Sequence, residues 1–178
     1  MNRRRWRSPA SAGPLRLIGL LSIAAALVLW QARDRPRDVS AIVGFARVID
    51  GDTLDISGRR VRLQGIDAPE ATQTCVAGGQ AYRCGAVATL ALGELLRGRI
   101  IRCAPSGADR YGRTLADCWI DDDGTDISRW MVRQGLAVAY RHYSYHYLPD
   151  ELLARLAGRG LWAGSFTMPW DFRVSHSR

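Results

Sequence analysis

Three short segments of this chain carry carboxylates and arginines together. They are Asp50–Thr53 (D-G-D-T), Arg62–Glu70 (R-L-Q-G-I-D-A-P-E) and Asp109–Arg113 (D-R-Y-G-R). Each segment alone also fits a structural role, since Asp-Gly is a common hairpin turn and a residue before proline is usually extended. Together they supply the acidic and cationic groups that hydrolysis of a phosphodiester requires, and we treat them as one candidate site.

The residue types point to specific tasks. The carboxylates of Asp52 and Asp67 suit a hard cation, whose shell backbone carbonyls and water can complete. A third carboxylate, Glu70, could activate or orient a water molecule. The guanidiniums of Arg62 and Arg113 could hold a phosphodiester and neutralise charge in the transition state. The pattern therefore indicates a metal-assisted phosphodiesterase.

The elements expected to position these residues begin with a three-strand meander. Ala41–Ile49, Thr53–Ile56 and Arg60–Ile66 are strand-like, and turns at Asp-Gly and Ser-Gly separate them. The later elements follow from apolar spacing and end signals. We expect a helix over Gly79–Arg97, strands at Arg99–Cys103 and Thr114–Ile120, a helix capped by Thr125 or Asp126 that reaches Gln134, and a helix over Asp150–Ala157.

This order predicts a mainly β protein with helices (α+β), built on a five-stranded OB-fold barrel with three helices. The sequence shows no alternation of strands and helices of the kind that builds a parallel Rossmann sheet. We expect a basic N-terminal segment over residues 1–37 and one domain over residues 38–178. The 178 residues are too few for two sizeable domains.

The net charge of +8 is unevenly placed. Residues 1–37 hold eight Arg and one Asp, whereas residues 38–178 hold 17 Arg and 16 acidic residues. The domain is therefore nearly neutral, which argues against binding of nucleic acid by bulk charge alone. All the basic residues are Arg, so no Lys is present for Schiff-base chemistry.

The N-terminus has the order of a signal segment. The basic cluster Asn2–Arg7 precedes Leu17–Trp30, which carries no charge, although a membrane span needs about 20 residues. A snorkelling Arg16 would allow a marginal anchor. Trp30 is too large for a usual cleavage site, which favours an uncleaved signal-anchor over a cleaved signal or a twin-arginine signal. We expect a domain anchored at the cytoplasmic membrane and lying outside the cytoplasm (periplasmic), or secreted if the signal is cleaved.

The four cysteines are even in number and fit an oxidising compartment. Our preferred pairing is local for Cys75 with Cys84, which bracket a Gly-rich loop, and cross-strand for Cys103 with Cys118. Zinc binding is the alternative. It is disfavoured because the chain contains no Cys-x-x-Cys.

The three segments, with the later Val132–Ala137 (V-R-Q-G-L-A), resemble staphylococcal (thermo)nuclease-like domains from about Val43 to Trp162. The resemblance implies an OB-fold barrel and calcium-dependent cleavage of DNA and RNA that leaves 3′-phosphates. It also implies three kinds of site residue: calcium ligands (Asp52, Asp67 and the Ala68 carbonyl), arginines on the scissile phosphate (Arg62 and Arg113), and a general base or water-positioning acid (Glu70).

Substrate contacts follow from the same resemblance. Arg110 stands where the family has Lys and keeps the charge near a terminal phosphate, beside Tyr111. The family's nucleotide-contacting tyrosines correspond best to Tyr140 and Tyr143, with Tyr145 and Tyr147 as competitors. The loop between the first two cysteines replaces a Lys-rich loop of the family.

Two non-catalytic functions remain as alternatives. The first is an OB-fold module that binds single-stranded nucleic acid, which would not need Asp52, Asp67 and Glu70. The second is a module on the same barrel that binds a protein partner. For the nuclease we infer DNA and RNA as substrate, a membrane contact through the N-terminal helix, no protein partner and a monomeric state.

Overall fold

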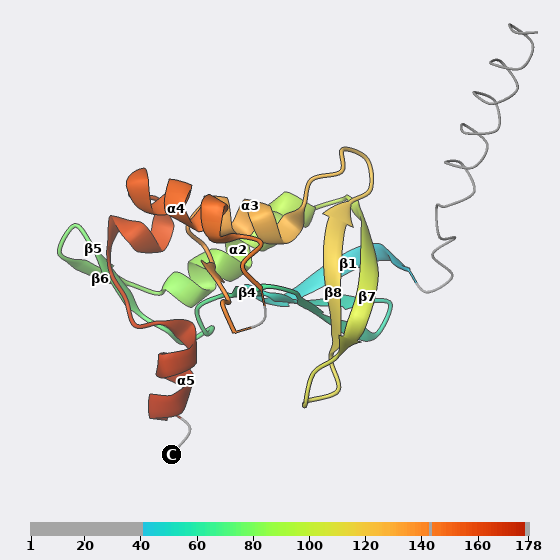
Figure 1. Ribbon diagram of the computed structural model, residues 1–178, viewed down its shortest axis with the longest axis horizontal. Coiled ribbons are helices and arrows are strands. Elements are labelled where there is room, and N and C mark those ends of the chain that lie inside the picture. The colour runs from blue at the N-terminus through green and yellow to red at the C-terminus, as the bar shows by residue number, and fades with distance from the viewer. Residues whose placement is uncertain (1–40, 143, 177–178) are drawn as a thin grey trace, which may run out of the picture. The chain divides into compact units, whose positions relative to one another are not determined.

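The computed structural model describes residues 41–142 and 144–176, and five of its strands close into a barrel in the order β1-β2-β3-β8-β7 (Figure 1). The barrel strands are β1 (Ile42–Asp50), β2 (Thr53–Ile56), β3 (Arg59–Leu63), β7 (Ile100–Ala108) and β8 (Thr114–Ile120). β1 pairs antiparallel with both β2 and β7, and β3 runs parallel to β8, which closes the sheet. The predicted α+β fold with a five-stranded barrel is confirmed.

Alternation along the strands fills the barrel interior. Leu54 and Ile56 of β2 and Val61 and Leu63 of β3 are fully buried, as expected where successive side chains point to opposite faces of a strand. Helix α2 (Cys84–Leu96) adds apolar side chains to the same core, namely Ala88, Leu92 and Leu96. Figure 1 shows α2, α3 and α4 gathered beside the barrel.

The chain before α2 differs from the prediction. The helix expected from Gly79 begins only at Cys84, because β5 (Cys75–Ala77) and β6 (Gln80–Tyr82) form a hairpin there. Its turn residues, Gly78 and Gly79, both have positive φ, which glycine adopts at little cost. β10 (Gly164–Ser165) pairs with β5 and completes a small three-stranded sheet.

Four α-helices lie in the described residues, one more than predicted. α3 (Ile127–Arg133) begins as expected, with Asp126 accepting a hydrogen bond from a backbone N–H. α4 (Leu148–Leu156) begins two residues before the predicted Asp150, because proline is tolerated in the first turn of a helix. A short 3₁₀ helix, η1 (Gly160–Ala163), leads to the unpredicted α5 (Pro169–His176).

Both predicted disulfides are present. Cys75–Cys84 joins β5 to the start of α2, and Cys103–Cys118 joins opposed residues of β7 and β8. No free cysteine remains, so the zinc alternative is wrong. The expectations for residues 1–37 lie outside the described residues. Within 41–142 and 144–176, no helix is long and apolar enough to cross a membrane.

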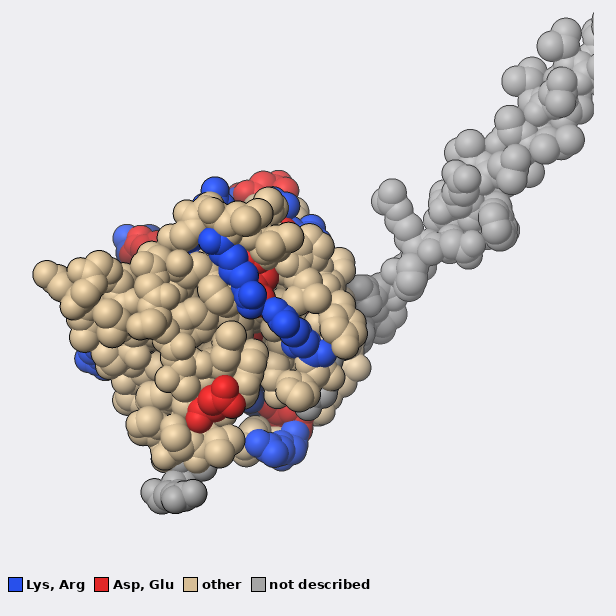
Figure 2. Space-filling model, turned by 60° about the vertical axis from the view of Figure 1, so that its left-hand side comes forward, with Lys and Arg blue, Asp and Glu red and all other residues tan. Residues whose placement is uncertain are grey.

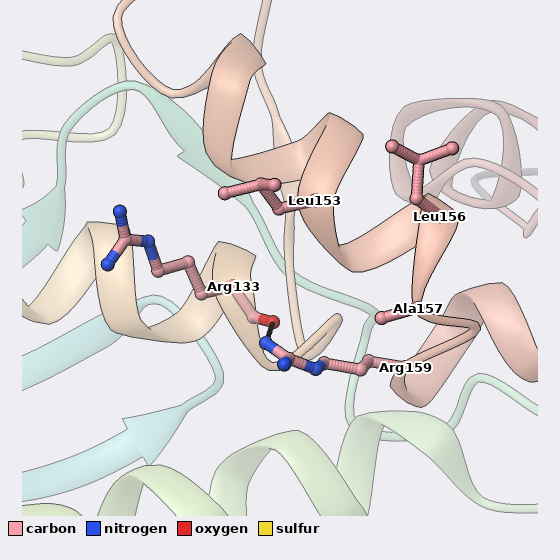
Figure 3. Close-up of a pocket in the computed structure, with 5 residues that line it drawn as sticks. All are labelled: Arg133, Leu153, Leu156, Ala157 and Arg159. Carbon is pink, nitrogen blue, oxygen red and sulfur yellow. Dashed lines mark hydrogen bonds between the residues drawn. The ribbon is translucent and has the colours of Figure 1, made fainter.

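The face in Figure 2 is mostly uncharged, with a short row of basic side chains and acidic groups beside it. A cavity of about 460 Å³ lies between α3 and α4, and none of its lining residues belongs to the three polar segments (Figure 3). These residues are Arg133, Leu153, Leu156, Ala157 and Arg159.

Candidate active site

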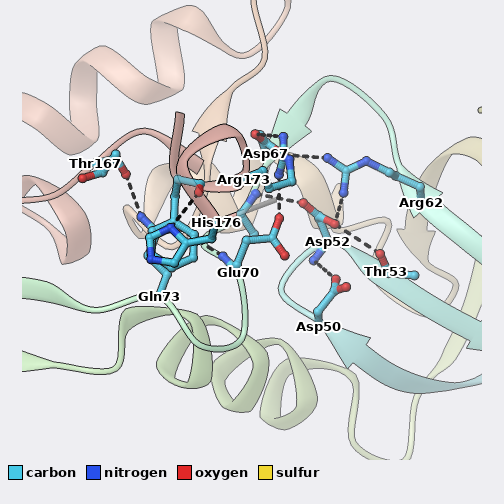
Figure 4. A network of polar contacts seen from close by, with 12 residues as sticks. Asp50, Asp52, Thr53, Arg62, Asp67, Glu70, Gln73, Thr167, Arg173 and His176 are labelled. Carbon is cyan, nitrogen blue, oxygen red and sulfur yellow. Dashed lines mark hydrogen bonds and ion pairs between the residues drawn. The ribbon is translucent and has the colours of Figure 1, made fainter. Parts of the chain in front are cut away.

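Two of the predicted metal ligands meet at one arginine (Figure 4). Arg62, near the end of β3, pairs through Nη1 with Asp52 Oδ1 and through Nη2 with Asp67 Oδ1, the second contact at 2.7 Å. Asp67 is fully buried and Asp52 is 4% exposed. The first two segments therefore converge on a shared guanidinium.

A glycine allows the two acidic segments to approach each other. A Cβ at Gly51 would lie 2.7 Å from the Ala68 Cβ, so only glycine fits this turn without a shift. The Ala68 N–H donates to Asp52 Oδ2 at 2.8 Å. Asp67 is held in β4 (Ile66–Asp67), which pairs antiparallel with β9 (Val138–Ala139). Backbone contacts thus fix both carboxylates before any ligand binds.

The buried carboxylates make this cluster attractive to positive charge. Burial raises the pKa of Asp52 to about 7, against the opposing effect of Arg62 and with a further rise from Asp50 and Asp67. Burial alone would lower the pKa of Arg62, but its two carboxylate partners outweigh that effect and the pKa is raised. A further cation bound beside Asp52 would favour its charged form and lower this raised pKa.

Glu70 has a fixed backbone and a carboxylate that reaches solvent. Its side chain is 37% exposed. Its N–H donates to Gln73 Oε1 at 3.3 Å, and its carbonyl accepts from the Gln73 N–H at 2.7 Å. Helix α2 packs directly behind this turn, because a Cβ at Gly85 would lie 1.8 Å from the Glu70 carbonyl oxygen. Glu70 is the site acid best placed to meet water.

The third segment joins the same network through a threonine. Arg113 Nη1 donates to Thr53 Oγ1 at 3.2 Å, and that hydroxyl donates to Asp52 Oδ1 at 3.2 Å. Asp109 holds the arginine by accepting from its Nε at 2.7 Å and its N–H at 2.9 Å. Both predicted arginines therefore lie beside the acidic cluster.

The residues predicted to contact nucleotides differ in how exposed they are. Tyr111 is 69% exposed, and the Arg110 guanidinium lies 4.9 Å from its ring centre. Tyr140 is half-buried, and its ring centre lies 5.7 Å from that of Trp170. Tyr143 lies outside the described residues.

The two tyrosines considered as alternative nucleotide contacts differ in burial. Tyr145 is 72% exposed, whereas Tyr147 is only 3% exposed and belongs to the core. Tyr147 therefore stabilises the fold rather than stacking on a base.

The donor chemistry of the site fits a hard cation. Buried carboxylate oxygens are the ligands that calcium prefers. Among residues 41–142 and 144–176, however, no three acidic, His or Cys side chains already surround a common metal position. The oxygens of Asp52 and Asp67 are instead occupied by arginines and a backbone N–H. A cation bound there would replace the two Arg62 contacts, whereas Arg173 also holds the other oxygen of Asp67, Oδ2.

One site residue was not predicted from the sequence. Arg173 of α5 pairs with both oxygens of Asp67, at 3.0 and 2.8 Å, and with Glu70 Oε1 at 2.7 Å. Pro169 and Asp171 resemble the start of a helix and could have indicated α5. No local pattern indicates a contact that spans more than 100 residues of chain.

Comparison with known proteins agrees with this geometry. The family model described as staphylococcal nuclease homologue matches residues 60–164. The succinoglycan biosynthesis protein ExoI of Rhizobium meliloti is 41% identical over 68% of this chain, and the match spans 64% of that relative's length.

Two further relatives are matched over more of their length. An uncharacterized endonuclease of Haemophilus influenzae is 33% identical over 83% of this chain and 79% of its own. The micrococcal nuclease of Shigella flexneri is 34% identical over 88% of this chain and 93% of its own. With the barrel and the three converging segments, these matches show that the chain belongs to the staphylococcal nuclease family of nucleic-acid hydrolases.

Proposed function

We propose that this protein is a calcium-dependent nuclease that hydrolyses phosphodiester bonds of DNA, RNA or both and leaves 3′-phosphates. The observation that carries the proposal is the convergence of three separate segments on one polar network. Asp52 and Asp67 share Arg62, and Thr53 links Arg113 to Asp52. A module that only binds nucleic acid gains nothing from buried carboxylates, since they repel the phosphate backbone.

The proposed ion site consists of Asp52, Asp67 and the Ala68 carbonyl. Calcium bound there would supply positive charge that neutralises the phosphate oxygens as the transition state forms. Both Nη atoms of Arg62 now pair with carboxylates. A cation that takes over those oxygens would leave Arg62 to donate to the phosphate instead.

The chain's own residues account for the rest of the reaction. Glu70 accepts a proton from water, or orients the water, as the water oxygen attacks phosphorus. Arg62 and Arg113 donate to the phosphate oxygens and stabilise their growing charge. The bond between phosphorus and the 5′ oxygen breaks, and the 5′ oxygen takes up a proton from solvent water, to which Glu70 later releases the proton it accepted. The products are a 3′-phosphate and a 5′-hydroxyl.

Substrate contacts outside the reacting phosphate are proposed for Tyr111 and Arg110. The exposed tyrosine ring offers a stacking surface, and the guanidinium beside it offers charge for a terminal phosphate. Tyr140 and Tyr143 stay as proposals by resemblance. We propose that the protein acts as a monomer.

We further propose that the domain lies outside the cytoplasm, held at the membrane by the N-terminal segment or secreted. The two disulfides support this location, because cytosolic thiols are normally kept reduced. The order of basic and apolar residues at the N-terminus is the second support.

The decisive experiment is digestion of plasmid DNA, single-stranded DNA and RNA by the purified chain, with calcium and with a chelator, beside Glu70→Gln. We expect cleavage that requires calcium and falls by at least a hundredfold in the variant, in the range of lost general-base catalysis. Tight binding without cleavage would instead establish the non-catalytic module. Cleavage that Glu70→Gln leaves unchanged would refute the assigned site.

A further inference from the structure

The C-terminal helix contributes a charged side chain to the candidate active site. α5 begins at Pro169, beyond the end of the family match at residue 164. Arg173 extends from α5 toward Asp67 and Glu70 (Figure 4). Its Nη1 contacts both carboxylates, at 3.0 Å from Asp67 Oδ1 and 2.7 Å from Glu70 Oε1.

The contact with Arg173 fixes the direction of the Glu70 carboxylate, which the turn around Glu70 does not fix by itself. Arg173 is the ion-pair partner found for the Glu70 carboxylate within the described residues. The other contacts of Glu70 with Gln73 involve its backbone. Asp67, by contrast, is also held by Arg62. Loss of Arg173 therefore leaves the Glu70 side chain free to rotate, while Asp67 keeps a partner.

Three further contacts attach the C-terminal segment to the site. The buried Gln73 donates through Nε2 to the Thr167 carbonyl at 2.6 Å. β10 pairs with β5, and Trp170 packs on Tyr140. Arg173 thus extends from a backbone that is fixed to the turn carrying Glu70. Such support is what holds a catalytic group in a productive orientation.

We propose that Arg173 is a positioning residue for the reaction, which orients the Glu70 carboxylate toward the attacking water through a fixed bridge to Asp67. The inference rests on the proposed nuclease function. The fork of the guanidinium suits the task, because it can bond two carboxylates in one geometry, which an ammonium group cannot reproduce.

The test compares Arg173→Ala, Arg173→Met and Arg173→Lys with the parent chain in steady-state cleavage of single-stranded DNA. We expect kcat to fall by about tenfold to a hundredfold in the Ala and Met variants, as for a misplaced catalytic group, with KM changed less than about threefold. Lys, which keeps the charge, should recover part of the loss. The Met variant keeps an unbranched side chain if Ala destabilises the fold.

A double-variant comparison separates action through Glu70 from action through Asp67. If Arg173 acts through Glu70, adding Arg173→Ala to Glu70→Gln should lower kcat by less than twofold further, because coupled effects are not additive. A loss that multiplies, or one that excess calcium restores, would assign the effect to the metal site and overturn the proposal.

A matched control and a second readout complete the design. Arg97→Ala removes an exposed arginine whose ion pair lies within its own helix turn, with Glu94, and should leave kcat unchanged. The melting temperatures of the Arg173 and Glu70 single and double variants should be non-additive if the contact exists in solution. An active parent with unaffected Arg173 variants refutes this inference alone, whereas an inactive parent refutes the nuclease function and the inference with it.

Discussion

Asp52 is a nearly buried carboxylate of the network, and its burial shifts its pKa. Its carboxylate is 4% exposed and contacts a guanidinium, a hydroxyl and a backbone N–H. Burial nevertheless dominates and raises its pKa to about 7, because two further carboxylates lie nearby and Arg62 is shared with one of them. A proton on Asp52 and a bound cation satisfy the same excess of negative charge.

This balance predicts how the stability of the metal-free protein depends on pH. The folded pKa of Asp52 lies above its ordinary value of 3.8, so its protonation stabilises the fold. That contribution is fully present below about pH 4 and is lost as the pH rises through about 7. In chelator, the melting temperature should therefore fall between pH 5 and pH 8.

Asp52→Asn isolates the contribution of this one group, since the amide resembles the protonated acid. Between pH 5 and pH 8 the melting temperature of the variant should fall less than that of the parent. At pH 8 the variant should have the higher melting temperature. Equal pH dependence in both proteins would show that Asp52 does not bind the proton.

At the level of elements, the site depends on how closely α2 approaches the turn that carries Glu70. Gly85 lies in the first turn of α2, where its missing side chain admits the Glu70 carbonyl. The Cys75–Cys84 disulfide holds the start of the same helix beside the β5–β6 hairpin. The helix is thus packed in the core at one end and against the turn that carries Glu70 at the other.

Gly85→Ala should therefore disturb the site more than the small volume of the added methyl group suggests. A Cβ 1.8 Å from the Glu70 carbonyl oxygen forces the turn to shift. We expect a loss of about 1–3 kcal/mol of unfolding free energy, as for overpacking, and at least a tenfold fall in kcat.

The same helix supplies a matched control. A Cβ at Gly93 meets no heavy atom within 4 Å. Gly93→Ala should stabilise α2 by about 0.5–1 kcal/mol and leave cleavage unchanged. Denaturant unfolding and steady-state rates measure both variants, and equal effects of the two substitutions would contradict the close approach at Gly85.

At the level of the whole molecule, two disulfides stabilise two different parts of the fold. Cys103–Cys118 ties β7 to β8 inside the barrel, and Cys75–Cys84 ties the hairpin to α2. The second bond belongs to a small apolar cluster with Val138 and Leu161. One cross-link therefore stabilises the barrel, and the other stabilises the hairpin on which β10 of the C-terminal segment pairs.

Loss of either bond should lower the unfolding free energy by roughly 2–4 kcal/mol. Denaturation of paired Cys→Ala variants under oxidising conditions measures this cost. In cells that make the chain, alkylation after denaturation should modify its cysteines only when a reductant is added first. Thiols that react without reductant would contradict a location outside the cytoplasm.

The sequence by itself determined the strands of the first meander and named three residues that the structure brings together. Strand-like runs separated by Asp-Gly and Ser-Gly turns predicted the β1–β2–β3 meander, and the three strands form as expected because strand and turn preferences are local properties of the chain. The residue types of Asp52, Asp67 and Arg62 predicted a cluster, and the structure brings them together.

Only the tertiary structure decided which distant groups complete that cluster. The helix was predicted from Gly79, but the positive φ of two glycines and a cross-link to Cys84 replace its first turn with a hairpin. Arg173 reaches Asp67 across 106 residues, and no short pattern encodes such a contact. The spacing of residues within a segment indicates which secondary structure that segment can form. The partner of a buried charge, by contrast, depends on how the whole chain packs.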